Sequence, residues 1–260
     1  MTTELVALLD GQVVGRVRRD TAGRLKFTYD ENWRSTRTAY SLSLSMPLAA
    51  IEHGHAAINA FLWGLLPDNE QILDRWARKF HVSPRNAFAL ISNVGEDCAG
   101  AVQFVRPDRV EAYINAGPKE VEWLEKSQVA ERLKALRLDH SAWRTPRDTG
   151  QFSLAGAQPK TALLLENGRW GVPSGRTPTT HILKPPTGEF DGFPENEHFC
   201  LALARAVGLP TAASQILHFN DEPAIVIERY DRQRIEKRLI RVHQEDMCQA
   251  LAILPTRKYE

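Results

Sequence analysis

The decisive stretch of this chain is a loop of small residues, Ser153-Leu154-Ala155-Gly156-Ala157-Gln158-Pro159-Lys160. It opens onto an apolar run, Thr161-Ala162-Leu163-Leu164-Leu165. Gly156 can adopt a positive φ without penalty, and the small neighbours let a ligand or another backbone approach closely. Uncovered main-chain N–H groups in such a loop suit phosphate binding. The stretch contains neither G-x-G-x-x-G nor G-x-x-x-x-G-K-[ST], so the local residues alone favour a tight β-turn.

Downstream of this loop the pattern predicts strands, one helix and then two more strands. Residues 161–165 and 169–172 form a hairpin around Glu166-Asn167-Gly168, and 180–184 is a strand ended by Pro185-Pro186. A helix is predicted over 195–207, because its apolar residues fall at i, i+3, i+4 and i+7 before Gly208 and Pro210. The last clear strands are 216–219 and 224–228.

Upstream of the loop, residues 1–50 predict a small sheet. Strands at 5–9, 12–17 and 25–29 are separated by the turn signals Asp10-Gly11 and Ala22-Gly23. Alternation of polar and apolar residues over 41–45 predicts one more half-buried strand.

Helical spacing follows over residues 56–92. A buried helix at 56–66 stops at Pro67, and Asp68 caps the next helix with Gln71 as its capping-box partner. Ser83-Pro84 is expected to start a third helix that runs to about Ile91. A strand over 101–105 closes this module, which makes the fold α+β.

The segment 107–150 is the expected connection between two domains, 1–106 and 151–260. Prolines punctuate it, and Val129, Leu133 and Leu136 predict a surface helix over 127–138. The run 145–150 is a polar lead-in to the loop at Ser153.

Composition is that of a soluble globular protein. Lys plus Arg number 33 against 32 Asp plus Glu, so the net charge of +1 gives no global attraction to nucleic acid or acidic membranes. Neither a signal peptide nor the ~20-residue apolar run of a transmembrane helix is present in the sequence. We therefore expect a cytoplasmic protein whose thiols, Cys98, Cys200 and Cys248, are reduced and mostly buried.

The loop closely resembles the nucleotide loop of the HipA family of bacterial toxin kinases, and further motifs follow in the family's order. They are Leu42-Ser43-Leu44-Ser45-Met46-Pro47-Leu48, Leu65-Leu66-Pro67-Asp68, Thr179-Thr180-His181-Ile182-Leu183-Lys184, Glu195-Asn196-Glu197, Ile227-Glu228-Arg229-Tyr230-Asp231 and Gln244-Glu245-Asp246-Met247-Cys248-Gln249. The resemblance covers nearly the whole chain. It implies a HipA N-terminal module over 1–106 and, over 151–260, a kinase-like N-lobe, an antiparallel sheet with one main helix, plus the start of the C-lobe.

For function, the resemblance implies the toxin of a toxin–antitoxin pair. Such a toxin is a serine/threonine protein kinase that transfers the γ-phosphate of ATP, with Mg²⁺, to an aminoacyl-tRNA synthetase, the glutamyl enzyme in the best-known members. The modification blocks translation and promotes growth arrest or persistence. The implied partner is a HipB-like helix-turn-helix antitoxin that supplies most DNA contacts, which agrees with the neutral charge of this chain.

The resemblance also assigns roles to residues. Lys184 would place its charge on the α- and β-phosphates, as kinase strand lysines do, although a lysine at a strand end commonly extends into solvent. Either Glu195 or Glu197 would orient it, or both serve the helix N-terminus. Ser153 would be a regulatory phosphosite, or else an exposed loop hydroxyl. The implied nucleotide-binding residues are Ala155, Gly156, Ala157, Gln158, Pro159, Lys160, Lys184, Glu228, Arg229 and Tyr230.

Three sets of polar residues also have a structural interpretation that needs no ligand. The arginines and lysine between 229 and 241 could form a phosphate-binding or acidic-partner patch, but a solvated hairpin is the commoner meaning of such a run. Tyr230 could equally be a half-buried strand residue. His181 and His243 have no partners at metal-ligand spacing, so no metal site is predicted.

Nothing in the sequence matches the catalytic-loop Asp, the Asn and the metal-binding Asp that a kinase needs. We therefore predict no catalytic residue in this chain, an incomplete Mg²⁺ site, and an inactive N-terminal fragment, whether an expression fragment or a naturally shortened product. The alternative is a non-catalytic module that binds antitoxin or nucleotide without phosphoryl transfer.

Overall fold

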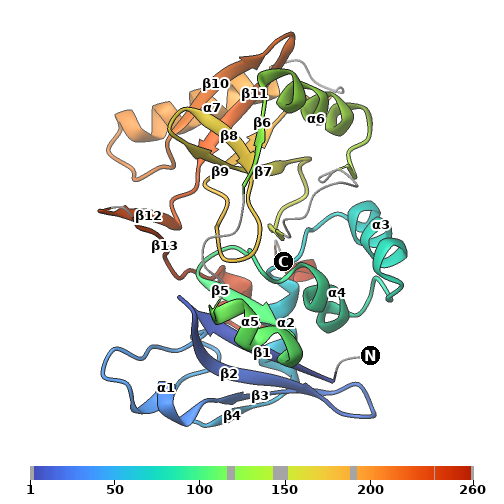
Figure 1. Ribbon diagram of the computed structural model, residues 1–260, viewed down its shortest axis with the longest axis vertical. Coiled ribbons are helices and arrows are strands. Elements are labelled where there is room, and N and C mark those ends of the chain that lie inside the picture. Colours follow the sequence, from blue (N-terminus) through green and yellow to red (C-terminus); the bar gives the residue numbers. More distant parts are fainter. Residues whose placement is uncertain (1–2, 116–120, 143–151, 188–191, 237, 259–260) are drawn as a thin grey trace. The chain divides into compact units, whose positions relative to one another are not determined.

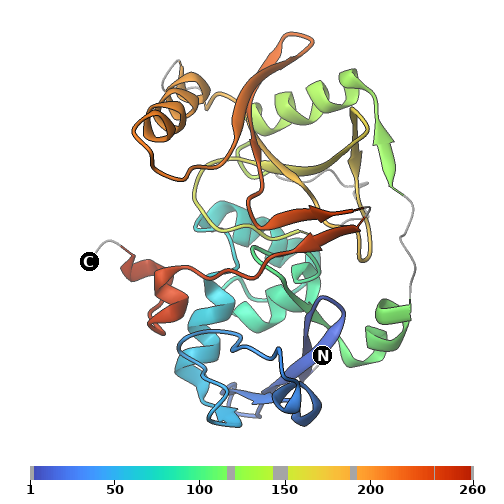
Figure 2. The ribbon, with the colours of Figure 1, turned by 90° about the vertical axis from the view of Figure 1, so that its left-hand side faces the viewer.

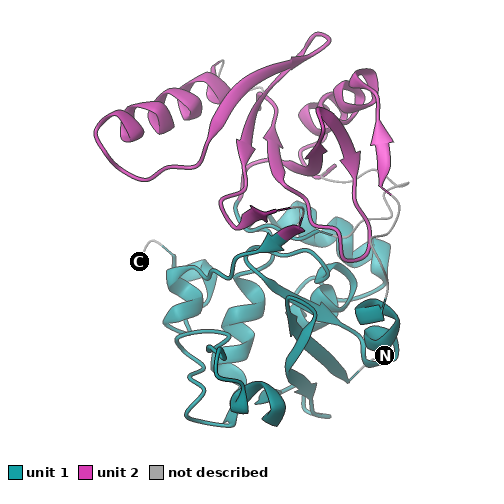
Figure 3. Ribbon diagram, turned by 60° about the vertical axis from the view of Figure 1, so that its left-hand side comes forward, with its two compact units in different colours: residues 1–117, 151–156, 240–260 teal, residues 118–150, 157–239 magenta. Residues whose placement is uncertain are grey.

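The computed structural model describes residues 3–115, 121–142, 152–187, 192–236 and 238–258. The chain forms two compact units, and each unit combines separate stretches of sequence (Figure 3). Unit 1 consists of Met1–Gly117, Gln151–Gly156 and Ile240–Glu260, and unit 2 of Pro118–Gly150 and Ala157–Leu239. The expected connecting segment therefore contributes residues 118–150 to unit 2, and the end of the chain belongs to unit 1.

Unit 1 is built on a five-stranded antiparallel sheet with the strand order β4-β3-β2-β1-β5 (Figure 1). Asp10 and Gly11 have φ angles of 46° and 80°, which confirms the predicted hairpin turn between the first two strands. The elements of unit 1 are β1 (Glu4–Leu9), β2 (Gln12–Arg19), β3 (Leu25–Tyr29), α1 (Glu31–Ser35), β4 (Glu52–His53), α2 (His55–Trp63), α3 (Glu70–Phe80), α4 (Ala87–Val94), β5 (Val102–Val105), η1 (Pro107–Arg109), α5 (Val110–Asn115), α8 (Met247–Ala250) and η2 (Pro255–Arg257).

The core of unit 1 lies on both faces of this sheet. Val6 and Leu8 of β1 pack with Val105 of β5 and Tyr113 of α5 on one face. Successive residues of a strand point to opposite faces. Phe104, the residue before Val105, accordingly meets Phe61 of α2 edge to face, with 6.5 Å between the ring centroids.

Three local predictions in unit 1 are wrong. Residues 41–45 form no strand, because the Ser43 and Ser45 hydroxyls bond each other and the Gln249 carbonyl, which closes a turn. The N-cap of α3 is Asn69 and not Asp68. The N-cap of α4 is Asn86 and not Ser83, and each asparagine accepts a backbone N–H three residues later.

The end of the chain packs into unit 1 through Gln249. Its side chain donates to the Phe61 carbonyl at 2.9 Å, and its backbone N–H donates to the N-cap carboxylate of Asp246 at 2.8 Å. Glycine is required at position 64, because a Cβ there would lie 2.4 Å from Gln249 Cγ. The motifs around Ser43 and Gln249 therefore meet in one core, and residues 240–258 pack with unit 1.

The buried imidazole of His243 should make the stability of unit 1 depend on pH. Its Nε2 atom donates to the Leu42 carbonyl at 2.9 Å, and Nδ1 is buried without a hydrogen-bond partner among the described residues. Burial lowers the pKa of His243 below its ordinary value of 6.5, against smaller opposing effects of the hydrogen bond to Leu42 and of the Glu245 carboxylate. The unfolded chain therefore binds a proton that the folded state rejects. We expect the free energy of unfolding to fall as pH drops below 6.5.

Urea unfolding at a series of pH values, followed through amide signals of unit 1, tests this prediction. His243→Gln keeps a side-chain donor for the Leu42 carbonyl but cannot titrate, so its acid slope should be smaller. An equal slope in both proteins would contradict the assignment.

Unit 2 contains a six-stranded antiparallel sheet with the order β10-β11-β9-β7-β8-β6. Figure 2 shows β10 and β11 as a long hairpin, and α7 packs against both strands. The chain passes from unit 2 back to unit 1 through the two-stranded hairpin β12–β13. The elements are β6 (Glu122–Leu124), α6 (Lys126–Leu138), β7 (Thr161–Glu166), β8 (Arg169–Val172), β9 (His181–Lys184), α7 (Phe193–Ala206), β10 (Ser214–Phe219), β11 (Glu222–Glu228), β12 (Arg232–Ile235) and β13 (Arg238–Arg241).

The two main helices of unit 2 differ in how their apolar faces are covered. The surface helix α6 is confirmed: Val129, Leu133 and Leu136 are fully buried on the side of the sheet, whereas residues 126–128, 131, 134 and 135 are exposed. In α7 the apolar stripe that predicts the helix is open, with Phe199 64 % and Leu203 53 % exposed. Periodicity identifies the apolar face of a helix but not the element that covers it.

Candidate nucleotide-binding site

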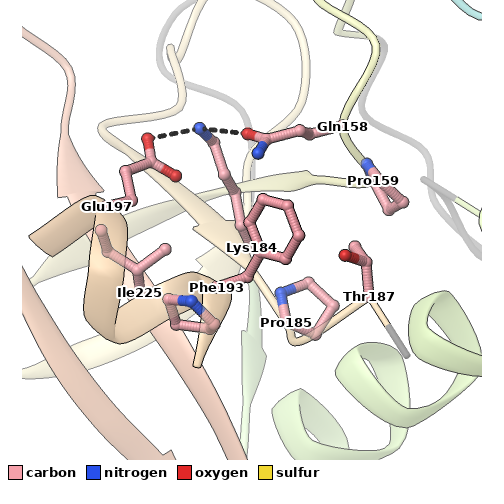
Figure 4. A pocket seen from close by; sticks show the side chains of 9 residues that line it. Gln158, Pro159, Lys184, Pro185, Thr187, Phe193, Glu197 and Ile225 are labelled. Carbon is pink, nitrogen blue, oxygen red and sulfur yellow. Dashed lines mark hydrogen bonds and ion pairs between the residues drawn. The ribbon is translucent and has the colours of Figure 1, made fainter. Parts of the chain in front are cut away.

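Lys184 is the central residue of the candidate site. It ends β9, a strand paired on one side with β7 and on the other with β11. Its ammonium group lies 2.6 Å from Glu197 Oε1 and 3.0 Å from Gln158 Oε1 (Figure 4). The Lys184 side chain is only 17 % exposed, so it does not extend into solvent. A strand, a helix and a loop thus converge on one cation.

The structure chooses between the two glutamates that the sequence leaves open. Pro194 lies in the first turn of α7 and is buried, which fixes the start of the helix. Glu195, also in the first turn, is exposed and suited to the positive end of the helix dipole. Glu197, two residues further along the helix, forms the ion pair with Lys184. Glu197 is therefore the orienting residue.

The loop before β7 has the expected conformation at its glycine. Gly156 has a φ of 104°, which favours glycine strongly. Ala155 and Gly156 belong to unit 1, whereas Ala157 begins the second stretch of unit 2. Ala157 and Gln158 are exposed, and Pro159 and Lys160 are buried. A small pocket of unit 2 is lined by Gln158, Pro159, Lys184, Pro185, Thr187, Phe193, Pro194, Glu197 and Ile225 (Figure 4).

The segment that leaves β11 alternates between outward and inward side chains. Glu228 is exposed, Arg229 is 3 % exposed, and Tyr230 is 70 % exposed. The backbone N–H of Glu228 donates to Ala213 at 2.8 Å, and that of Arg229 donates to Thr180 at 2.9 Å. Tyr230 is therefore not a half-buried strand residue. Both neighbours of Arg229 face outward, while Arg229 itself points into the unit.

The basic run between 229 and 241 is a hairpin and not one basic patch. Arg229 and Arg232 pair with Asp231 inside unit 2. Arg241 pairs with Asp97 in unit 1, at 3.2 Å. Arg234 and Arg238 are exposed on β12 and β13. Lys237, also part of the predicted run, lies outside the described residues.

Ser153 is not the exposed hydroxyl that its loop position suggests. It is fully buried in unit 1, its Oγ donates to the Leu65 carbonyl at 2.7 Å, and its N–H donates to the Asp97 carbonyl at 2.9 Å. A kinase could reach this hydroxyl only after the loop leaves its place. Sequence reasoning missed this anchoring because the partners lie 88 residues apart along the chain in the case of Leu65.

A larger groove in unit 1, of about 620 Å³, has the size of a ligand site but not the charge of a phosphate site. Asp68, Glu70 and Asp74 line it against Arg85, and the remaining lining is mostly apolar, from Trp63, Pro67, Leu73, Pro84, Leu254, Pro255 and Thr256. Carboxylates in this excess would repel a triphosphate. None of the predicted nucleotide-binding residues lines it.

Among the described residues there is neither a group of metal ligands nor a membrane-spanning helix. No group of three His, Cys, Asp or Glu side chains there could hold a metal ion, and His181 and His243 form no such group. Within the same ranges, none of the helices is both long and apolar enough to span a bilayer. Cys98 and Cys248 are buried thiols, whereas Cys200 is exposed.

The pairing of a strand lysine with a helix glutamate, beside a small-residue loop and an outward-facing segment after the next strand, is the arrangement of the sheet-containing lobe of protein kinases. The chain belongs to the HipA family. The HipA N-terminal domain matches residues 5–105, and the HipA-like C-terminal domain matches residues 152–260.

Known proteins agree with this assignment. The chain is 39% identical to the putative kinase Y4mE of Sinorhizobium fredii, covering 96% of this chain and 59% of that protein. It is 31% identical to the serine/threonine-protein kinase toxin HipA of Shewanella oneidensis, over 100% of this chain and 58% of the relative. A solved complex of HipA, HipB and operator DNA from Shewanella oneidensis MR-1 contains a chain that matches with a TM-score of 0.80 and 29% identity, over 98% of this chain and 58% of that chain. The chain thus spans less than two thirds of these relatives.

Proposed function

We propose that unit 2 binds ATP as the nucleotide lobe of a serine/threonine protein kinase that acts as a bacterial toxin. The Lys184–Glu197 ion pair carries the proposal. Glutamate at 2.6 Å holds the ammonium group at the end of a central strand, where it can meet the α- and β-phosphates. The exposed Ala157 and Gln158 offer an edge for the phosphates, and the segment 228–230, with Glu228 and Tyr230 exposed, is where the adenine base would lie.

The residues fit ATP better than they fit its metal. A lysine, a glycine loop and an outward segment are parts suited to the nucleotide itself, whereas no three His, Cys, Asp or Glu side chains of the described residues form a metal-binding group. When bound, Mg²⁺ would neutralise charge on the transferring phosphoryl group. We therefore propose that residues 1–260 alone bind ATP weakly and transfer no phosphate, and that the metal and proton-accepting carboxylates belong to the parts of the relatives that this chain does not match.

The proposed partner is supported by a solved relative, and the proposed substrate only by the resemblance to the HipA family. We propose an aminoacyl-tRNA synthetase as substrate, the glutamyl enzyme first, and growth arrest or persistence as the outcome in the cytoplasm. A HipB-like antitoxin is the proposed partner, because a relative is solved with HipB and operator DNA. DNA would be contacted mainly through the antitoxin. The second candidate is a non-catalytic module that binds antitoxin or nucleotide.

An ATP titration tests the nucleotide site and the proposed division of catalytic parts. Amide signals of uniformly labelled protein should shift at residues 155–160, 184 and 228–230 when ATP is added. Phosphate transfer to glutamyl-tRNA synthetase, measured in parallel with labelled ATP, should be undetectable for residues 1–260. No ATP-dependent shift at these positions would refute the nucleotide site, and robust transfer would refute the proposed division of catalytic parts.

We expect Ser153→Asp to release the loop from unit 1 and weaken ATP binding. A carboxylate at this fully buried position would face the Leu65 carbonyl without a compensating donor. Phosphorylation, which adds about −1.5 to −2 charges at pH 7, should act in the same direction. Hydrogen exchange of residues 152–158 measures the release, and ATP titration measures its consequence.

Ser153→Ala is the matched control. It loses one hydrogen bond, worth about 1 kcal/mol, but introduces no charge. If Ser153→Asp and Ser153→Ala show the same exchange rates and the same ATP affinity, Ser153 has no regulatory role of this kind.

A further inference from the structure

Three charged side chains are buried immediately behind the proposed adenine-binding segment. Arg229 Nε and Nη2 donate to the two carboxylate oxygens of Asp231 at 3.0 and 2.8 Å. Arg232 Nη1 lies 3.1 Å from the same carboxylate. The side chains of Arg229, Asp231 and Arg232 are 1 %, 6 % and 2 % exposed. One carboxylate therefore holds two guanidinium groups out of solvent.

Both arginines also bind the segment before β9. Arg229 Nη1 donates to Thr179 Oγ1 at 2.8 Å, and Arg232 Nε donates to the Thr179 carbonyl at 3.1 Å. The backbone N–H of Arg229 adds a bond of 2.9 Å to the Thr180 carbonyl. Because β9 ends at Lys184, this network ties the proposed adenine segment to the strand that carries the phosphate-binding lysine.

The role of such a cluster is better explained by the backbone conformation that it fixes than by a contribution to the free energy of unfolding. Desolvating three charges offsets most of the energy that their attraction provides, and apolar side chains of similar size are often as stabilising. Bidentate guanidinium contacts, by contrast, fix direction as well as distance. With Arg229 held inward, the alternation of the chain turns Glu228 and Tyr230 outward, as their exposure shows.

We infer that Arg229, Asp231, Arg232 and Thr179 are positioning residues for recognition of the adenine base. They hold the main chain of residues 228–230 in the shape that meets the base, while the Arg229 side chain itself does not touch the nucleotide. This inference rests on the proposed ATP site and refines it. Different parts of unit 2 bind the base and the phosphates, so a substitution can weaken binding of the base without changing binding of the phosphates.

The test compares ATP with inorganic tripolyphosphate, which has the phosphates but no base. Thr179→Val removes the hydroxyl that accepts from Arg229 and keeps the side-chain shape, and Thr179→Ser keeps the hydroxyl. Arg229→Lys keeps the charge but not the bidentate contact. For Thr179→Val and Arg229→Lys, we expect the dissociation constant for ATP to rise roughly fivefold, the range of one lost hydrogen bond. Tripolyphosphate binding should be unchanged, and Thr179→Ser should resemble the wild type.

The outcomes distinguish this inference from the proposed function. Amide spectra first establish that each variant is folded at the temperature of the titration. If the wild type binds ATP more tightly than tripolyphosphate and Thr179→Val and Arg229→Lys preserve that ratio, the positioning role is overturned and the ATP site stands. If the variants lose ATP and tripolyphosphate affinity equally, the network acts on the whole lobe and not on the base, which also overturns it. A wild-type chain that binds neither ligand overturns both.

Discussion

Replacing Lys184 by alanine is expected to weaken ATP binding roughly ten- to hundredfold, because a charge-assisted contact to phosphate is worth about 1.5–3 kcal/mol. The ammonium group is already placed by Glu197 at 2.6 Å and Gln158 at 3.0 Å. Little reorganisation is therefore needed when phosphate arrives. The same substitution should hardly change the free energy of unfolding, since partly exposed ion pairs contribute about 0–1 kcal/mol. Isothermal titration with ATP and urea unfolding together measure the two effects.

Two variants make this expectation specific. Lys134→Ala removes an exposed lysine of α6 in the same unit and should leave ATP affinity unchanged. Glu197→Gln removes the carboxylate charge beside Lys184 but keeps the lysine and an oxygen that can accept from it, so its loss of affinity should be smaller than that of Lys184→Ala. ATP binding that is equally strong in Lys184→Ala and Lys134→Ala would show that the phosphate site lies elsewhere.

Local sequence signals predict the strands and turns of this fold well. The hairpins at Asp10-Gly11 and at Asn167-Gly168 adopt the positive φ angles that their residues favour. The strand that carries Lys184 and the helix that follows it also lie where the pattern places them. These features depend on neighbouring residues, and so the sequence contains the information directly.

Contacts between segments that lie far apart in the sequence could not be predicted from local patterns. Nothing in residues 244–249 indicates that Gln249 packs against Phe61 and the serines near 43. The same limit conceals the burial of Ser153 under Leu65. The predicted start of α3 is wrong for a simpler reason. Asn69 lies next to Asp68 and both residues are good N-caps, so only the backbone geometry determines which of them caps the helix.

The sequence predicts some residues of the candidate site and leaves others open, because the roles of the latter depend on contacts in three dimensions. The order of motifs identifies Lys184 and residues 228–230, but Glu195 and Glu197 are two positions apart on one helix and therefore face different directions. Only the start of α7 at Phe193 determines that Glu197 meets the lysine. The role of Arg229 is harder still, because a charged residue in a polar motif suggests a ligand contact. Its burial against Asp231 is visible only in three dimensions.

Asp231→Ala is expected to lower the free energy of unfolding of unit 2 by about 3–5 kcal/mol, because it leaves two buried guanidinium groups without their carboxylate. Arg229 and Arg232 side chains are 1 % and 2 % exposed, so water cannot replace the lost partner without local opening. Relative to a total stability of about 5–15 kcal/mol, such a loss is large. Urea unfolding monitored through amide signals of unit 2 measures it.

A second bidentate pair in the same unit supplies the control. Arg137 donates to both carboxylate oxygens of Glu222 at 3.0 and 2.8 Å, but the Arg137 side chain is 37 % exposed. The Glu222 side chain is itself only 11 % exposed, but Glu222→Ala leaves behind just the Arg137 guanidinium, which water can reach, so its cost should be smaller than that of Asp231→Ala, although the bond geometry is alike. Replacing Arg229, Asp231 and Arg232 together by Met, Leu and Met should recover most of the stability lost in Asp231→Ala, because no buried charge then remains. Equal losses for Asp231→Ala and Glu222→Ala would mean that burial does not determine the strength of these pairs, and the case for a buried network behind residues 228–230 would fail.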